Sequence, residues 1–178
     1  MKEYAFENRP VDTTRLTAPR MPLADYFIAS RSLVIPCHDV VIQYQDGALL
    51  VVRDNQPAKG LLFPIGGRIE RGIPIEESLR RKVKEECNLD LSDIAELGYA
   101  RAYFSTDSFG HGRGSDVINF MFYGKGTGEL MLDNLHRDPV IVTPEMYTPE
   151  FRQSLHPYVK YMMDKAMVII KRNNKSVY

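Results

Sequence analysis

The stretch from residue 66 to residue 89 constrains the fold of this chain more than any other segment. Its first part, residues 66–72, contains three glycines, two of them paired. Paired glycines occur where the backbone takes unusual dihedral angles or where another group comes very close, so we do not expect regular structure there. The second part predicts a helix over 75–89, because apolar residues recur every four positions and form a stripe that faces a core. The stripe consists of Ile75, Leu79, Val83 and Cys87.

The predicted helix also carries an acidic pair, Glu85 and Glu86. Arg81 and Lys82 lie one turn earlier on the same side of the helix. A glycine segment that exposes backbone carbonyls and amides beside two carboxylates suits a divalent cation and a phosphate. Mg²⁺ in particular is usually held by one or two carboxylates together with substrate phosphates. Lys82 is either a charge that faces solvent or a phosphate contact, and the sequence leaves both open.

Composition narrows the class of protein. The chain has 178 residues, which is one domain by length and enough to bury a core. Lys and Arg number 23 and Asp and Glu number 23, so we expect no general nucleic-acid binding and no membrane association. No apolar run approaches the length of a membrane span. The two cysteines, Cys37 and Cys87, are not spaced as a metal motif, and we expect reduced thiols in a cytoplasmic protein.

The chain divides into an arm and one domain. Residues 1–22 are expected to form an N-terminal surface arm that a partner subunit orders, and residues 23–178 a single domain that includes a C-terminal helix. Strands mixed with two substantial helices predict an α+β fold, an α/β/α sandwich. The other expected elements are a helix over 23–31, hairpin strands 40–45 and 48–53 around Asp46-Gly47, strands 61–64, 94–106 and 117–123, a mobile loop 107–115, a turn at 124–128, irregular chain over 129–140 and a helix over 149–171 that Pro157 interrupts.

The stretch around the acidic pair resembles the Nudix box, G-x5-E-x7-R-E-U-x-E-E-x-G-U, where U is aliphatic. The matching positions are Gly67, Arg81, Val83, Glu85, Glu86 and Leu89. Three positions depart from the pattern: Ile73 and Lys82 replace glutamates, and Asn88 replaces the last glycine. The Lys82 departure bears on the chemistry, because the glutamate at that position of typical members helps to hold metal or acts as a base. The resemblance implies the Nudix fold, in which a mixed β-sheet lies between helices.

A closer resemblance extends over roughly residues 23–165. Residues 31–39, 49–60 and 133–138 resemble the GDP-mannose mannosyl hydrolase branch, which also lacks the glutamate at the position of Lys82. That branch hydrolyses a nucleoside diphosphate sugar by attack of water at the anomeric carbon and releases a nucleoside diphosphate. The resemblance therefore implies a hydrolase dependent on Mg²⁺, with Mn²⁺ as a substitute, and a homodimer.

The same resemblance assigns roles to individual residues. Glu86, the carbonyl of Gly67 and Glu85 are expected metal ligands, whereas Leu135 stands where the branch has a ligating Gln. Arg53 and Arg68 match the arginines that stabilise the leaving diphosphate. The remaining expected residues are His136 as the base, Asp39 near the sugar and Arg31 as a further substrate contact.

Simpler interpretations stay open for each of these residues. The glycine segment and the acidic pair also fit an ordinary strand-to-helix connection, the arginines fit surface positions, and His136 and Asp39 fit loop and turn positions. Two other functions stay open as well. One is a conventional Nudix pyrophosphohydrolase that cleaves between phosphates, and the other is a non-catalytic nucleotide-binding module, in keeping with Ile73, Lys82 and Leu135.

Overall fold

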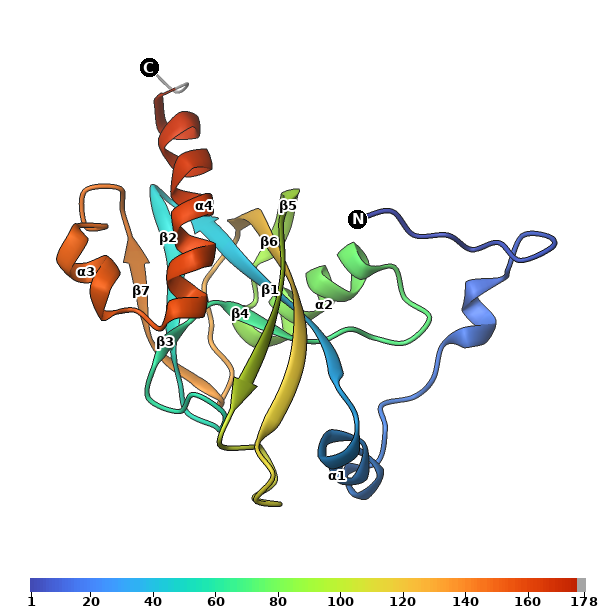
Figure 1. The fold of residues 1–178 in the computed structure, drawn as a ribbon. Helices are drawn as coiled ribbons and strands as arrows, with labels where there is room; N and C mark the ends of the chain where they lie inside the picture. The colour runs from blue at the N-terminus through green and yellow to red at the C-terminus, as the bar shows by residue number, and fades with distance from the viewer. Residues whose placement is uncertain (176–178) are drawn as a thin grey trace.

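The computed structural model describes residues 1–175, in which seven strands form one mixed sheet (Figure 1). The strand order is β3-β2-β1-β6-β5, with β4 paired to β1 and β7 paired to β2. The pairing of β1 with β6 is parallel, and the other pairings are antiparallel. The elements are η1 (Thr13–Leu16), α1 (Leu23–Ser32), β1 (Ile35–Tyr44), β2 (Gly47–Arg53), β3 (Leu62–Phe63), β4 (Ile65–Arg68), α2 (Ile75–Cys87), β5 (Asp90–Phe104), β6 (Ser115–Thr127), β7 (His136–Val142), α3 (Pro149–Ser154) and α4 (Pro157–Lys175).

The sheet separates two apolar cores, which confirms the predicted α+β sandwich. Successive side chains of a strand point to opposite faces. Val40 and Ile42 of β1 pack in one core with α2, and Val41 packs in the other core with α4. Figure 1 shows α4 crossing one face of the sheet while α2 lies beyond the other. The site described below is built around α2 and the strands beside it.

Helix α2 confirms the predicted apolar stripe, because all four stripe residues are buried. The helix ends where Asn88 takes a left-handed conformation with φ of 60°. Asparagine tolerates this conformation better than other residues except glycine, so the position that usually holds glycine keeps its helix-ending role. At the other end, the side chain of Glu3 in the N-terminal arm accepts a hydrogen bond from the amide of Ile75 at 3.1 Å.

The paired glycines correct one expectation, because Gly66 and Gly67 lie in a regular strand, β4, and not in a loop. Residues Asp39 and Gly66 are register partners in the antiparallel pairing of β1 with β4. A Cβ at position 66 would lie 1.9 Å from Asp39 Oδ1 and 2.5 Å from the carbonyl oxygen of His38. Glycine is therefore required by the close approach of other atoms, while the loop itself falls after Arg68.

Two further segments are more regular than expected. Strand β6 continues through the glycines at 124 and 126. These two positions hold glycine because a Cβ would lie 2.6 Å from the side chain of Leu91 at position 124 and of Ile42 at position 126. The segment expected to be irregular contains β7, which begins at His136. The loop expected to be mobile is held by Asp107, whose carboxylate accepts hydrogen bonds from backbone amides within that loop. The predicted break at Pro157 is confirmed, since it separates α3 from α4.

The N-terminal arm contains the short 3-10 helix η1 and no buried residue. The backbone of the arm comes close to Gly72, because a Cβ on Gly72 would lie 2.5 Å from the Thr17 nitrogen. The arm therefore lies against the start of α2, and its ordering by a partner subunit stays a prediction.

Cys37 and Cys87 are both free thiols. Among residues 1–175, no helix is long and apolar enough to cross a membrane.

Replacement of Leu79 by alanine tests how far the fold depends on the packing of α2. Leu79 is fully buried between α2 and the sheet, so we expect the free energy of unfolding to fall by about 2–5 kcal/mol. Urea denaturation followed by circular dichroism measures this change. The matched control is Arg80→Ala, one residue further along and exposed, which should leave the stability nearly unchanged. Equal losses in both variants would show that α2 does not anchor the core.

Candidate active site

A cleft of about 890 Å³ opens beside the start of β4 and the inner face of α2. The predicted residues that line it are Asp39, Arg53, Gly67, Arg68, Glu85, Glu86 and His136. They come from β1, β2, β4, α2 and β7, so the fold gathers side chains that are nearly a hundred residues apart in the sequence. Arg31 is not among the lining residues. Its guanidinium carbon lies 5.6 Å from the centre of the Phe27 ring, on the exposed side of α1.

Two backbone connections bring the base candidate to the acidic helix. In the antiparallel pairing of β2 with β7, His136 is the direct register partner of Arg53. Before β7, the amide of Asp133 donates a hydrogen bond of 3.0 Å to the carbonyl of Glu86. The connection into β7 is thereby tied to the end of α2. Sequence reasoning treated this segment as irregular, so it did not place His136 opposite Arg53.

The imidazole of His136 is held between two carboxylates. Nδ1 lies 2.8 Å from Asp133 Oδ1, and Nε2 lies 3.9 Å from Glu86 Oε2. Because a carboxylate accepts hydrogen bonds, we assign the ring proton to Nδ1, which leaves Nε2 with a free lone pair. Asp133 also accepts a hydrogen bond from the Leu135 amide at 2.9 Å. Sequence reasoning gave Asp133 no role, although its position three residues before His136 was a visible signal.

Two buried atoms of opposite charge in the cleft have no hydrogen-bond partner among the described residues. They are Arg53 Nε and Glu86 Oε2. Burial raises the pKa of Glu86 to about 7, and the nearby Lys82 ammonium opposes that shift. Buried polar atoms are nearly always paired in folded proteins. A ligand with an anionic group for Arg53 and a cation for Glu86 would satisfy both atoms.

Lys82 lines the same cleft and does not face solvent freely, whereas its contact with a phosphate stays a prediction. Its side chain is only 16% exposed, and its Nζ lies 3.2 Å from Glu85 Oε2 and 3.7 Å from Glu86 Oε1. A Cβ at Gly67 would lie 3.3 Å from Lys82 Cε, so the lysine stem passes over the bare backbone of β4. An ammonium therefore neighbours both carboxylates of the predicted metal site.

The oxygen donors fit a divalent ion that substrate phosphates complete. Glu86 offers the unpartnered Oε2, Glu85 is 59% exposed, and Gly67, the predicted carbonyl donor, lines the same cleft. Within residues 1–175, no group of three or more His, Cys, Asp and Glu side chains is arranged to hold a metal ion. An open site of this kind is the usual one for Mg²⁺.

Asp39 lies at the floor of the cleft beside the backbone of Gly66. Burial raises its pKa to about 6, while a hydrogen bond from Tyr158 and the charge of Arg53 lower it. The Tyr158 hydroxyl of helix α4 donates to Asp39 Oδ2 at 2.5 Å. Tyr158 is itself buried.

An aromatic wall on the opposite side of the cleft was not predicted. The guanidinium carbon of Arg68 lies 3.5 Å from the centre of the Tyr26 ring, a cation–π contact. Tyr26 in turn meets Phe109 edge-on, with ring centres 5.0 Å apart. Helix α1 and the 107–115 loop thus contribute apolar surface beside a predicted phosphate-binding arginine.

His38 is buried in the structure and does not line the cleft. Its Nε2 lies 2.8 Å from Ser78 Oγ, which also accepts a hydrogen bond from the Glu70 amide at 2.9 Å. Burial lowers the pKa of His38 to about 4, so the ring is neutral at physiological pH. The contact fastens the start of α2 to β1 and is structural.

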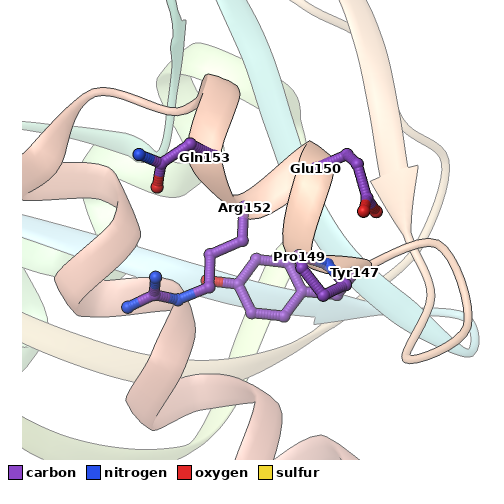
Figure 2. A pocket seen from close by; sticks show the side chains of 5 residues that line it. All are labelled: Tyr147, Pro149, Glu150, Arg152 and Gln153. Carbon is purple, nitrogen blue, oxygen red and sulfur yellow. The ribbon is translucent and has the colours of Figure 1, made fainter.

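A second hollow, of about 600 Å³, lies on helix α3 (Figure 2). Figure 2 shows Arg152 beside the ring of Tyr147, with Glu150 and Gln153 on the same helix. The Arg152 guanidinium is bound to Asp164 by two hydrogen bonds of 2.7 Å, and the Tyr147 hydroxyl donates to the same carboxylate at 2.9 Å. The positive charge of Arg152 is neutralised by Asp164, and the two residues fasten α3 to α4. We therefore assign this hollow no binding role.

Comparison with known proteins identifies the class. Residues 36–161 match the model of the NUDIX domain, so the chain belongs to the NUDIX family. It is 31% identical over 130 residues to the low-salt glycan biosynthesis protein Agl8 of Haloferax volcanii, an alignment that covers 71% of this chain and 78% of Agl8.

Solved structures show the same fold at lower identity. A MutT NUDIX hydrolase from Burkholderia pseudomallei matches with a TM-score of 0.60 and 15% identity, over 75% of this chain and 98% of that one. The NUDIX domain of Shewanella oneidensis NrtR, solved with ADP ribose, matches with a TM-score of 0.53 and 17% identity, over 89% and 100%. At these identities the likeness establishes the fold alone.

Replacement of Tyr158 by phenylalanine tests the environment of Asp39. The hydroxyl stabilises the charged carboxylate, so its removal should move the pKa of Asp39 upward from about 6. Because the folded pKa is above the unfolded one, the stability that Asp39 contributes is full below pH 4 and declines as the pH rises through the folded pKa. In the variant this decline should shift to higher pH.

A pH titration of the ¹³C carboxyl resonance of Asp39 measures the pKa directly. The matched control is Tyr161→Phe, on the exposed side of the same helix, which should leave the Asp39 titration unchanged. A Tyr158→Phe protein whose Asp39 titrates as in the parent would show that the hydrogen bond does not tune this group.

Proposed function

We propose that this protein hydrolyses a nucleoside diphosphate sugar by attack of water at the anomeric carbon, which releases a nucleoside diphosphate and the free sugar. The observation that carries the proposal is the pairing of β2 with β7, which sets Arg53 directly opposite His136 at the cleft. A cation for the leaving group and a base for the water thereby meet in one place.

The leaving diphosphate requires positive charge at its oxygens. Arg53 offers the buried, unpartnered Nε, and Arg68 lies on the neighbouring strand β4. A divalent ion, held by Glu86, Glu85 and the Gly67 carbonyl, would supply further stabilisation of the developing negative charge. In a cleft that excludes much of the water, such charges stabilise a leaving group more strongly than they do in bulk solvent.

His136 is the proposed base. Its ring is fixed by Asp133, so Nε2 is positioned to take a proton from the attacking water. The order of events is that Nε2 accepts the water proton, the water oxygen bonds to the anomeric carbon, and the bond from that carbon to the diphosphate oxygen breaks. Both electrons of the broken bond stay with the diphosphate.

A sugar at the floor of the cleft would meet Asp39, whose Oδ2 is held by Tyr158. Carboxylates commonly recognise sugar hydroxyls by accepting their hydrogen bonds. The similarity to a protein named for glycan biosynthesis supports a nucleotide that carries a sugar. GDP-mannose and GDP-glucose are the first substrates to test. The homodimer and the cytoplasmic location stay predictions.

Attack at phosphorus is the second candidate. It is favoured by the unpartnered Glu86 Oε2, a carboxylate oxygen free to take a proton from an attacking water. The products then differ, because cleavage between the phosphates releases a nucleoside monophosphate and a sugar phosphate.

Hydrolysis of GDP-mannose with Mg²⁺ in ¹⁸O-labelled water separates these reactions. We expect GDP and mannose, with the label in mannose and not in phosphate. Label in GMP or in mannose phosphate would instead place the attack at phosphorus. No product from a panel of nucleotide sugars, together with a higher melting temperature in nucleotide, would indicate a binding module.

Replacement of His136 by glutamine should lower kcat by about 10²–10⁴-fold, because it removes the base and keeps a polar side chain of similar size. Steady-state kinetics of product release measures the change. The matched control is His156→Gln, since His156 packs against Phe63 and Phe104 and does not line the cleft. If both variants turn over as the parent does, His136 is not the base.

A further inference from the structure

Lys82 stands where the Nudix box has a carboxylate, and the structure shows where its ammonium group lies. The side chain does not extend along the solvent-exposed face of α2. It crosses β4 at Gly67, where the absence of a Cβ leaves room for the lysine stem, and ends between Glu85 and Glu86. The ammonium therefore lies within the cleft, beside the donors assigned to a divalent ion.

The ammonium keeps donors that no described residue uses. An ammonium has three N–H groups. The hydrogen bond that Lys82 makes within residues 1–175 is the one to Glu85 Oε2 at 3.2 Å, since Glu86 Oε1 at 3.7 Å is beyond hydrogen-bond distance. The remaining donors face a cleft whose predicted ligand carries phosphate oxygens. Lys82 forms two ion pairs, and only the one with Glu85 is weakened by solvent, because Glu85 is 59% exposed whereas Glu86 is 11% exposed.

The neighbouring cation on the same helix is arranged differently. Arg81 also borders the cleft, but its guanidinium is bound to Glu77 at 3.0 Å and to Glu70 at 3.3 Å. Its charge is therefore engaged with two carboxylates on the exposed side of the helix. Arg81 and Lys82 thus each pair with two carboxylates, but the partners of Arg81 are 37% and 47% exposed, whereas Glu86 beside Lys82 is only 11% exposed.

We propose that Lys82 is a resident cation of the candidate site, which donates hydrogen bonds to the diphosphate and replaces the carboxylate that would bind an additional divalent ion. Its charge neighbours Oε1 of Glu86, and Oε2 is the unpartnered oxygen of the same carboxylate. The site thus takes at most one divalent ion and binds a nucleoside diphosphate even without metal. This inference rests on the proposed function for the nature of the ligand, but it concerns binding and not turnover.

The first test measures GDP binding by isothermal titration calorimetry in EDTA. We expect the parent protein to bind GDP without metal, and Lys82→Met to weaken this binding by about 10- to 100-fold, the loss of one or two charge-assisted hydrogen bonds. Lys82→Arg, which keeps a cation, should retain most of the affinity. The matched control is Lys84→Met on the same helix, because Lys84 is exposed and pairs with Asp90 outside the cleft.

The second test counts metal ions by electron paramagnetic resonance of Mn²⁺ without nucleotide. The parent should bind at most one Mn²⁺ per chain. Lys82→Glu, which restores a carboxylate, should bind Mn²⁺ at least about tenfold more tightly or take up a second ion, because added ligand charge raises cation affinity. Melting temperatures verify that each variant is folded.

Each outcome bears on the proposal. GDP affinity in EDTA that is equal in the parent and Lys82→Met overturns the diphosphate contact, and unchanged Mn²⁺ binding in Lys82→Glu overturns the replacement of a metal ligand. A parent protein that does not bind GDP in EDTA also overturns it. Lysine-dependent GDP binding without hydrolysis of any nucleotide sugar would support the inference and reject the proposed function, so the two fail separately.

Discussion

The close approach of β4 to β1 is the constraint on which the candidate site depends. Asp39 Oδ1 occupies the space of a side chain at Gly66, and Lys82 crosses the backbone at Gly67. The first contact fixes the Asp39 carboxyl group at the floor of the cleft. The second lets the Lys82 ammonium lie beside Glu85 and Glu86. The backbone of both residues is that of an ordinary strand, so no unusual dihedral angle requires glycine here. Glycine is required because other atoms occupy the space of a side chain.

The cleft is a site in which charges are positioned before any ligand arrives. Arg53 Nε and Glu86 Oε2 are buried and unpartnered, and both would gain a partner from a metal-bound diphosphate. Leaving such atoms unsatisfied destabilises the folded protein, so their presence together is informative about binding. The clamp of Arg152 on Asp164 shows the opposite case, in which polar groups are satisfied internally and serve the fold.

Elements with strong local signals were predicted well. The apolar stripe of α2, the hairpin at Asp46-Gly47 and the break at Pro157 follow from periodicity and backbone chemistry within a few residues. Strand β7 and the end of β6 were missed, because their regularity depends on partners far along the chain. The glycines of β6 weaken a strand in isolation but are demanded by the side chains of Leu91 and Ile42 packed over them.

The sequence by itself determined the family-like spacing of the box, the apolar face of α2 and the identity of several ionisable groups of the cleft, but not Arg20, Glu70 or Asp116. The tertiary structure decided which of them meet. Arg53 faces His136 because β2 pairs with β7, Asp39 meets Tyr158 of α4, 119 residues further along the chain, and Lys82 turns inward while Arg31 stays outside. The physical reason is that hydrogen-bonded strand register and core packing act between residues distant in the chain, whereas sequence patterns report only local periodicity.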